Sequence, residues 1–411
     1  MCNTGDKCAI ADYCGGCAYQ GVPYDIQLER KNAEIIALLA KHKVDEKVYE
    51  GIIPATLRKA YRNKMEYTFG DFEKGGALEL GMHRKKHFMS IVTSDMCMLV
   101  PDDFNKVLRA TLNFCRECGY SFYNKKNHLG LLRNLIVRRG VNSGELLIDI
   151  VTAPEGMVLV HSRSIEKSYG LDGEDNGRFD EAGFLKRIMG LNLAGTVVGV
   201  LHTINNSLSD AVIDCGTRTI FGRRFYKEEI LGLKFKVSIF SFFQTNINAV
   251  ERLYADALDL IPDIEDKVVY DLYCGTGTIS QLMSSRAKSV YGIEIVEEAV
   301  ESAVANTVLN GIENCHYICG DVKKKLEEPE ERPDVIVVDP PRSGIQDKVV
   351  RMISSYEVPE ILYISCNPKT LAINLEQFAW LGYRPKLIRA YDNFVMTRHV
   401  ECIALIQRVK S

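Results

Sequence analysis

Three side chains in the last quarter of the chain have the properties needed for covalent catalysis. Cys366 follows the apolar run at 361–365, and a thiol at the end of a buried strand is suited to attack an electrophilic carbon. Asp339 precedes two prolines, which restrict the backbone and make a rigid turn. Glu401 is the candidate base, although a single glutamate is more often a solvated surface group. A lone cysteine is likewise more often inert, so these roles depend on where the strands place the side chains.

A thiol and a base at one site can alter carbon 5 of a pyrimidine ring. This carbon is a poor nucleophile, but addition of a thiolate to carbon 6 enables it to attack a methyl group. A base must then remove the proton from carbon 5 before the thiol can leave. The scheme makes Cys366 the nucleophile and Glu401 the base. An Asp-Pro-Pro turn also serves methylation of amino groups, so it indicates the class of enzyme better than the target atom.

A glycine-rich turn predicts the binding site of the methyl donor. Gly275 and Gly277 follow the apolar run at 268–271, and glycines let the backbone turn tightly against a ligand. Glu294 ends the next strand, where a carboxylate can hold the hydroxyls of a ribose, and Asp321 follows the third strand, predicted at 315–319, within reach of an adenine edge. The turn lacks the third glycine of dinucleotide enzymes, so an enzyme that binds S-adenosylmethionine fits better than an oxidoreductase. The alternative to a cofactor site is that a strand–helix turn and an acid on the next strand occur together by chance.

The elements that must position these residues alternate in type after residue 231. Strands are predicted at 268–271, 290–294, 335–339 and 361–365, with a last strand at 402–406, and helices at 278–285, 297–310 and 347–354. Apolar strands that alternate with helices predict a parallel, doubly wound sheet. Such sheets bind ligands at the carboxyl ends of their strands. The predicted fold class is therefore α/β, with a Rossmann-like methyltransferase domain at residues 231–411.

A cluster of cysteines near the amino terminus has the spacing of metal ligands. Cys8, Cys14 and Cys17 lie within ten residues, and Cys97 is the best candidate for a fourth ligand. In a reducing compartment such thiols favour metal ligation over disulfides, and four thiolates suit an iron–sulfur cluster. Zinc, which also accepts four thiolates, is the alternative. The pair at 115 and 118 has ligand spacing too, but it lies on a predicted helix and is interpreted as structural.

The sequence predicts that the middle of the chain is rich in β-strands and basic. Strands are predicted at 65–69, 131–137, 146–151 and 196–203, and a helix at 104–118. Residues 51–140 contain 16 Lys and Arg against 8 Asp and Glu, whereas residues 292–335 contain 4 against 11. This asymmetry favours a region that binds a polyanion, although ordinary surface variation also produces such differences. We predict an iron–sulfur segment and helix at 1–50, a central β-rich domain that binds a polyanion at 51–230 and the methyltransferase domain at 231–411.

Composition limits the class of protein. The chain has 411 residues, of which 46% are hydrophobic and 26% charged, and this composition excludes a largely disordered protein. The sequence contains no apolar run of the roughly 18–20 residues needed to span a bilayer and no signal-peptide core. We therefore expect a cytoplasmic protein without a membrane partner.

Taken together, these motifs resemble the RNA uracil-5-methyltransferase family, and specifically its iron–sulfur branch that acts on 23S ribosomal RNA. The resemblance covers nearly the whole chain. Its most specific motifs are Phe-Phe-Gln-Thr-Asn at 242–246, Asp-Pro-Pro-Arg-Ser-Gly at 339–344 and Ser-Cys-Asn-Pro at 365–368. Cys-Gly-Gly-Cys at 14–17 is similar to the opening of that branch, and the sequences at 61–64 and 81–86 are similar to its RNA-facing central domain.

The resemblance implies a role for each motif residue. S-adenosylmethionine would be contacted by Gln244, Tyr273, Glu294, Asp321 and Asp339. Thr278 stands where some members have an asparagine that touches the cofactor, and it is included in this set. Cys366 would be the nucleophile, and Glu401 would abstract the proton. A 4Fe–4S cluster would be held by Cys8, Cys14, Cys17 and Cys97.

RNA binding is expected to depend on the central domain. Many members begin with a small β-barrel RNA-binding domain, and the cysteine segment here starts too early to leave room for one. The basic residues expected to supply RNA affinity are Arg58, Lys59, Arg62, Lys64, Arg84, Lys85, Lys86, Arg133, Arg138 and Arg139. A solvated charged face is the alternative for any one of them.

The predicted activity is the formation of 5-methyluridine in 23S ribosomal RNA by a monomeric enzyme, through a covalent bond between Cys366 and carbon 6 of uracil. A transfer RNA uracil-5-methyltransferase is one alternative, although that branch typically lacks the cysteine cluster. An RNA cytosine-5 methyltransferase generally places a cysteine beside the motif at 339–342, which has none. A non-catalytic iron–sulfur sensor that binds RNA is the third alternative, and the intact set of motif residues argues against it.

Overall fold

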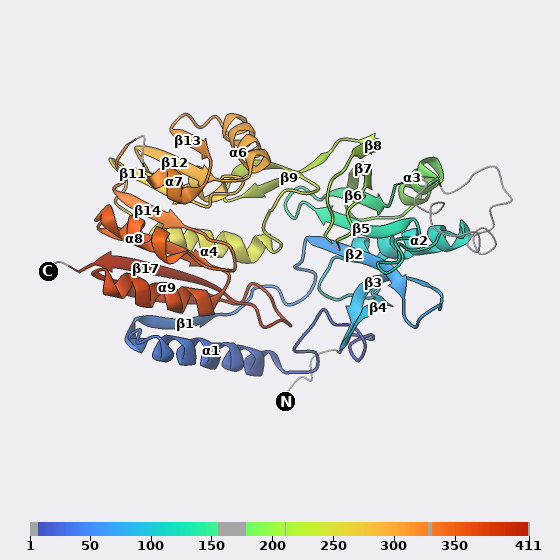
Figure 1. Cartoon of the computed structure of the whole chain (residues 1–411), viewed down its shortest axis with the longest axis horizontal. Helices are drawn as coiled ribbons and strands as arrows, with labels where there is room; N and C mark the ends of the chain where they lie inside the picture. The colour runs from blue at the N-terminus through green and yellow to red at the C-terminus, as the bar shows by residue number, and fades with distance from the viewer. Residues whose placement is uncertain (1–6, 155–177, 210, 328–330, 410–411) are drawn as a thin grey trace.

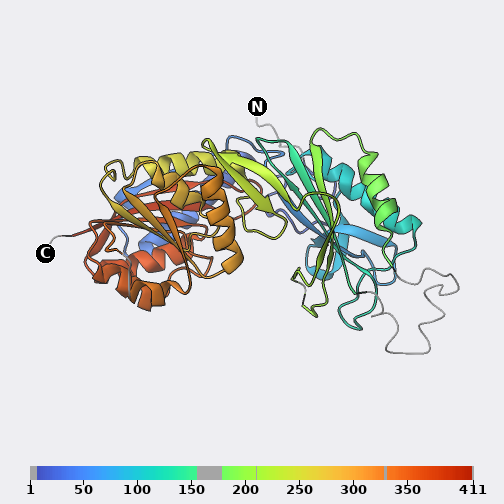
Figure 2. The same cartoon turned by 90° about the horizontal axis from the view of Figure 1, so that it is seen from above.

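The computed structural model describes residues 7–154, 178–209, 211–327 and 331–409. These residues form two lobes, each built on its own β-sheet (Figure 1). Figure 2 shows the two lobes side by side, with a two-stranded ribbon between them. The ribbon consists of β9 (Phe225–Ile230) and β10 (Leu233–Ser238). The architecture is mixed α/β with a β-rich lobe, as the sequence predicted.

The carboxy-terminal lobe contains an eight-stranded sheet in the order β1-β16-β17-β15-β14-β11-β12-β13. Its strands are β1 (Tyr49–Ile53), β11 (Val268–Leu272), β12 (Ser289–Glu294), β13 (Cys315–Cys319), β14 (Val335–Val338), β15 (Glu360–Ser365), β16 (Tyr383–Tyr391) and β17 (Glu401–Arg408). β11 pairs in parallel with both β12 and β14, so the strand order reverses at β11. This reversal creates the crevice where such sheets bind ligands. The predicted Rossmann-like fold is confirmed.

Helices cover both faces of this sheet. They are α1 (Tyr24–Lys41), α4 (Ile247–Asp259), α5 (Thr278–Ser284), α6 (Glu297–Leu309), α7 (Val322–Glu327), α8 (Asp347–Ser355) and α9 (Pro368–Trp380). Residues of α4 and α5 belong to one hydrophobic cluster, and residues of α1, α7, α8 and α9 belong to another. Because both faces are covered, the central strands are largely apolar, and all four residues of β14 are apolar and buried. Among the described residues, no helix has the length and apolar composition to cross a membrane.

Elements from the amino-terminal part of the chain complete the carboxy-terminal lobe. β1 extends the sheet by pairing in parallel with β16, after the short 3-10 helix η1 (Glu46–Val48). α1 lies against α9 (Figure 1). The domain boundary predicted between residues 50 and 51 therefore falls inside a strand, and the domain limits remain a prediction.

The central lobe contains a seven-stranded sheet in the order β4-β3-β2-β5-β6-β7-β8. Its strands are β2 (Lys64–Asp71), β3 (Leu78–Arg84), β4 (His87–Thr93), β5 (Leu132–Arg139), β6 (Glu145–Thr152), β7 (Thr196–Ile204) and β8 (Thr217–Gly222). Two helices, α2 (Asp102–Glu117) and α3 (Glu181–Met189), contact each other and share a hydrophobic cluster with the sheet. The sheet is antiparallel except that β6 and β7 pair in parallel, and with one helical layer it leaves a broad face on which other segments can pack.

Candidate active site

The candidate nucleophile and the candidate base meet because β15 and β17 run antiparallel. Ser365, the last residue of β15, is paired with Cys402 of β17. One step further along this register, Cys366 comes opposite Glu401, and residues directly opposite each other in a ladder project to the same face. The Glu401 side chain is buried, whereas Cys366 is half-buried and lines a cavity. The fold thus places a thiol and a carboxyl group together at the carboxyl end of β15.

Burial and neighbouring carboxylates raise the pKa values at this edge. The pKa of Cys366 rises to about 11, first by burial and then by the charges of Glu401 and Asp339, against the opposing effect of Arg342. Burial and the charge of Asp339 raise the pKa of Glu401 to about 8. Burial and Asp271 raise the pKa of Asp339 to about 7. The thiol is therefore uncharged at neutral pH, and Glu401 can gain or lose a proton near physiological pH.

One asparagine ties the cysteine to the Asp-Pro-Pro turn. The side-chain amide of Asn367 donates a hydrogen bond of 2.8 Å to the carbonyl oxygen of Arg342. The Oδ1 atom of the same side chain accepts a bond of 3.2 Å from the amide of Lys369 and so caps α9. Because Asn367 follows Cys366 directly, these two bonds fix the position of the thiol relative to the turn after β14.

The predicted cofactor turn has a strained backbone. Tyr273, Gly275 and Gly277 all have positive φ angles, of 67°, 54° and 74°. Glycine adopts such angles easily, but a tyrosine does so at a cost, and strain of this kind concentrates at functional sites. Gly277 also passes close to Tyr317, since a Cβ atom at this position would clash with the tyrosine hydroxyl.

Glu294 closes this turn from the neighbouring strand. One carboxylate oxygen accepts hydrogen bonds of 2.8 and 2.9 Å from the amides of Ile295 and Val296, and the other accepts one of 3.1 Å from the amide of Gly275. A carboxylate has about four acceptor positions, so one remains for a ligand. The three backbone donors hold the carboxylate rigidly beside the glycine turn.

The remaining predicted cofactor residues lie in two places. Asp321 lies within electrostatic reach of Tyr273. Burial of Tyr273, and then the charge of Asp321, raise the pKa of this tyrosine to about 12. Thr278 begins α5 and is buried beneath the turn. Gln244 lies closer to the catalytic edge, where its side-chain amide donates a hydrogen bond of 3.1 Å to the hydroxyl of Tyr254. Both places border the carboxyl ends of the central strands.

Two residues that the sequence did not assign belong to the same region. Tyr254 on α4 is buried, and burial and the charge of Asp339 raise its pKa well above the usual range. The Oδ2 atom of Asp271 accepts a bond of 2.5 Å from the Ser280 hydroxyl, while its Oδ1 atom has no partner among the described residues. Asp271 could have been found from its position before the glycine turn. Tyr254 sits in an amphipathic helix without a motif, so the sequence carried no signal for it.

The four cysteines predicted to bind a cluster come together where the lobes meet. Cys14 forms an isolated β-bridge with Arg84 of β3, and Cys17 and Cys97 pack against the same small hydrophobic cluster. Burial raises the pKa of Cys97 to about 11, with further contributions from Cys17, Cys14 and Cys8. All four thiols therefore lie within electrostatic reach of one another. Within the described ranges, no three or more His, Cys, Asp or Glu side chains are arranged as a metal site, so the cluster and its ligand set remain a prediction.

Some basic residues of the central lobe have structural roles. Arg133 is buried and donates hydrogen bonds to the carbonyl oxygens of Asn205, Ser207 and Ser209. Arg138 is buried and bonds the carbonyl oxygen of Ser241. The expectation that these two arginines contact RNA is therefore wrong. Alternating sequence patterns cannot separate a buried arginine from an exposed one when backbone carbonyls satisfy the buried one.

Comparisons with known families match the carboxy-terminal lobe. Residues 324–409 match the tRNA (Uracil-5-)-methyltransferase family, and residues 269–352 match a general methyltransferase domain. The first match covers the candidate nucleophile and base, and the second covers the glycine turn.

Known proteins are similar over nearly the whole chain. An uncharacterized RNA methyltransferase of Clostridium acetobutylicum is 43% identical over 98% of this chain and 84% of its own length. An uncharacterized RNA methyltransferase of Caldanaerobacter subterraneus is 45% identical over 96% of this chain and 83% of its own length. Among solved structures, the tRNA (uracil-54, C5)-methyltransferase of Pyrococcus abyssi, in complex with S-adenosyl-L-homocysteine, has a similar fold. Its TM-score is 0.73 at 23% identity, over 96% of this chain and 86% of that chain.

Proposed function

The chain belongs to the RNA methyltransferases of the uracil-5-methyltransferase family, and on this premise we propose that it forms 5-methyluridine in 23S ribosomal RNA through a covalent adduct on Cys366. The observation that carries the proposal is the pairing of β15 with β17, which brings Cys366 and Glu401 to one edge of the sheet. A nucleophile and a base at one edge are the two groups that methylation of carbon 5 requires.

The residues act in a fixed order. The Cys366 thiol gives up its proton to solvent, its sulfur adds to carbon 6 of the uracil, and the electron pair displaced from the carbon 5–carbon 6 bond makes carbon 5 nucleophilic. S-adenosylmethionine supplies the methyl group that carbon 5 attacks. Ionised Glu401 then removes the proton from carbon 5, the ring double bond re-forms, and the bond between Cys366 and carbon 6 breaks. The target base must leave its stack to enter this edge.

The residues at the strand ends fit the methyl donor. The strained turn leaves space beside Gly275, since a Cβ atom there would meet nothing within 4 Å. Glu294, at the end of β12, keeps an acceptor position free next to this space, and the Oδ1 atom of Asp271, which has no partner among the described residues, lies near the end of β11. We assign the adenosine to Tyr273, Thr278, Glu294 and Asp321, and the reacting end of the donor to Gln244 and Asp339. These assignments follow the motif positions.

The cysteine cluster supports the ribosomal branch of the family. Four half-buried thiols from two segments suit an iron–sulfur cluster, because iron would stabilise the thiolate form that burial disfavours. We propose that Cys8, Cys14, Cys17 and Cys97 hold 4Fe–4S and that the cluster has a structural role. We further propose that the central lobe binds RNA and that the enzyme acts as a monomer.

Transfer RNA is the second candidate substrate. The family matched by residues 324–409 and the similar structure from Pyrococcus abyssi are both named for tRNA. The reaction at Cys366 would be the same, so only the RNA distinguishes these candidates.

Methyl transfer to unmodified RNA tests the proposal. Purified protein would be incubated with isotopically labelled S-adenosylmethionine and undermodified ribosomal and transfer RNA, and the separated RNAs analysed by nucleoside mass spectrometry. The proposal predicts labelled 5-methyluridine in 23S RNA. The same product in transfer RNA alone would overturn the substrate, and a labelled cytidine or no labelled nucleoside would overturn the reaction.

A further inference from the structure

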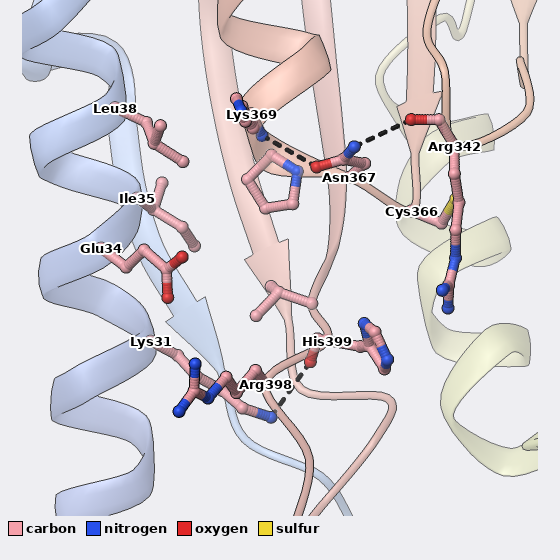
Figure 3. Close-up of a pocket in the computed structure, with 12 residues that line it drawn as sticks. Lys31, Glu34, Ile35, Leu38, Arg342, Cys366, Asn367, Lys369, Arg398 and His399 are labelled. Carbon is pink, nitrogen blue, oxygen red and sulfur yellow. Dashed lines mark hydrogen bonds between the residues drawn. The ribbon is translucent and has the colours of Figure 1, made fainter. Parts of the chain in front are cut away.

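A cavity beside the candidate nucleophile is lined by cationic side chains. It has a volume of about 260 Å³ and is bordered by α1, the start of α9 and residues 398–400. Figure 3 shows Cys366 at one side of this cavity and Arg342, Lys369 and Arg398 around it. The three cations come from three separate segments of the chain, so their convergence is a product of the fold.

These cations have no directly bonded acidic partner among the described residues. Arg342, Lys369 and Arg398 are exposed, and their side chains form no hydrogen bond or ion pair with any part of the chain that the structure describes. Glu34 is the acidic side chain among the cavity residues. Lys31, by contrast, is paired with a buried aspartate. The cavity therefore carries an excess of positive charge next to a thiol.

The walls between the charges are apolar and neutral. Ile35 and Leu38 of α1 and Pro368 at the start of α9 line the cavity. His399 also lines it, and burial together with Arg342, Lys31 and Arg62 lowers its pKa, which favours the neutral imidazole. A mixture of apolar surface and separate cations suits a sugar or base with a phosphate on each side.

The position of the cavity follows from the proposed reaction. A uridine whose carbon 6 contacts the sulfur of Cys366 carries its own ribose and phosphates within one nucleotide of that sulfur. The backbone must therefore pass through the space next to Cys366. We infer that this cavity binds the phosphodiester backbone on one side of the target uridine, with Lys369 and Arg398 as the phosphate contacts. This inference rests on the proposed function and adds a second RNA-binding surface outside the central lobe.

The test compares charge at this cavity with charge elsewhere on the same lobe. Methyl transfer to undermodified ribosomal RNA would be measured across a range of salt concentrations for the wild type and for Lys369→Ala/Arg398→Ala. The matched control is Lys267→Ala, an exposed cation just before β11 at the opposite end of the strands. The double variant should raise KM for RNA about tenfold and reduce the slope of log affinity against log salt by about 1.4, because each lost contact to a single strand contributes about 0.7. Affinity for S-adenosylmethionine should not change.

A charge-preserving variant separates contact from structure. Lys369→Arg/Arg398→Lys should retain the wild-type salt slope and most of the affinity. If the alanine pair has the same KM and salt slope as Lys267→Ala while the wild type methylates RNA, the backbone site is wrong and the proposed function stands. If the wild type methylates no RNA, the proposed function fails and the backbone site fails with it.

Discussion

The ammonium group of Lys31 lies 2.6 Å from a carboxylate oxygen of Asp392, and neither side chain is exposed to solvent. Lys31 belongs to α1, near the start of the chain, whereas Asp392 follows β16, close to the candidate base. The same ammonium group donates to the carbonyl oxygens of Phe394 and His399. One buried lysine thus holds both ends of the segment that leads into Glu401.

Removal of this lysine should destabilise the protein and impair the reaction. Lys31→Met leaves Asp392 as a buried, unpaired charge, which costs about 3–5 kcal/mol of folding free energy. We expect kcat to fall as well, because the segment before Glu401 loses three contacts. The measurements are urea unfolding and methyl transfer under single-turnover conditions. Lys41→Met, on the exposed last turn of α1, is the control and should leave both unchanged. A Lys31→Met protein as stable as this control would contradict the account.

The cysteine segment contacts the same stretch of chain. The amides of Ala18 and Tyr19, directly after Cys17, both donate to the carbonyl oxygen of Met396, at 2.8 and 3.1 Å. Cys14→Ser should therefore lower the iron content of anaerobically purified protein and also lower kcat, since the segment before Glu401 loses support. Iron would be measured by elemental analysis. Cys118→Ser, an exposed cysteine at the end of α2, is the control. Unchanged iron in Cys14→Ser would refute the ligand assignment.

The pH dependence of the rate should report the site's carboxyl groups. The pKa of Glu401 is raised to about 8, and only its ionised form can accept a proton, so kcat should rise as pH increases through 8. Arg342 lowers the pKa values of both Glu401 and Cys366. Arg342→Ala should therefore shift the rising limb to higher pH. The comparison is a pH–rate profile of each protein at saturating substrate. A limb at the same pH in both would show that Arg342 does not influence the titrating group.

A buried aspartate far from this site should make stability depend on pH. Asp149 of β6 accepts a hydrogen bond from the Thr203 hydroxyl, and burial raises its pKa to about 8. Between the ordinary aspartate value, near 4, and this raised value the folded protein binds more protons than the unfolded chain, so stability falls as pH rises over that range. Between pH 5 and pH 8 the wild type should therefore lose folding free energy, and Asp149→Asn should reduce that loss by on the order of 3 kcal/mol.

Denaturant unfolding at pH 5 and pH 8 measures this effect. Asp263→Asn, at an exposed position in the other lobe, is the matched control and should retain the wild-type difference between the two pH values. An Asp149→Asn protein with the same difference as wild type would mean that the aspartate is not protonated in the fold.

The sequence predicted the elements of the methyltransferase lobe better than their assembly. The apolar runs identified the strands, and Cys366 and Asp339 follow β15 and β14 as expected. The adjacency of Cys366 and Glu401 could not be predicted, because β17 runs antiparallel and its register depends on pairing across the sheet. The same limit applies to β1, whose five residues join a strand more than 300 positions away. Local patterns carry no information about such partners.

Buried polar residues were also not predictable from the sequence. Arg138 lies in a basic region and was expected to contact RNA. It is instead buried in the core, where it donates a hydrogen bond to a backbone carbonyl oxygen. Nothing in the sequence indicated that Lys31 is buried, because its partner Asp392 lies 361 residues further along the chain. Both residues obey the rule that a buried charge is paired or hydrogen-bonded, and only the fold reveals the partner.

Covalent capture of the RNA tests the central claim most directly. Without a base, the reaction should stop after methyl transfer, with the RNA still bonded to the enzyme. Glu401→Gln incubated with S-adenosylmethionine and undermodified ribosomal RNA should therefore accumulate a denaturant-resistant protein–RNA adduct, and peptide mass spectrometry should place methylated uridine on Cys366. Cys366→Ala/Glu401→Gln should form no adduct. An adduct on another residue, or none in Glu401→Gln while the wild type makes 5-methyluridine, would contradict the assigned roles.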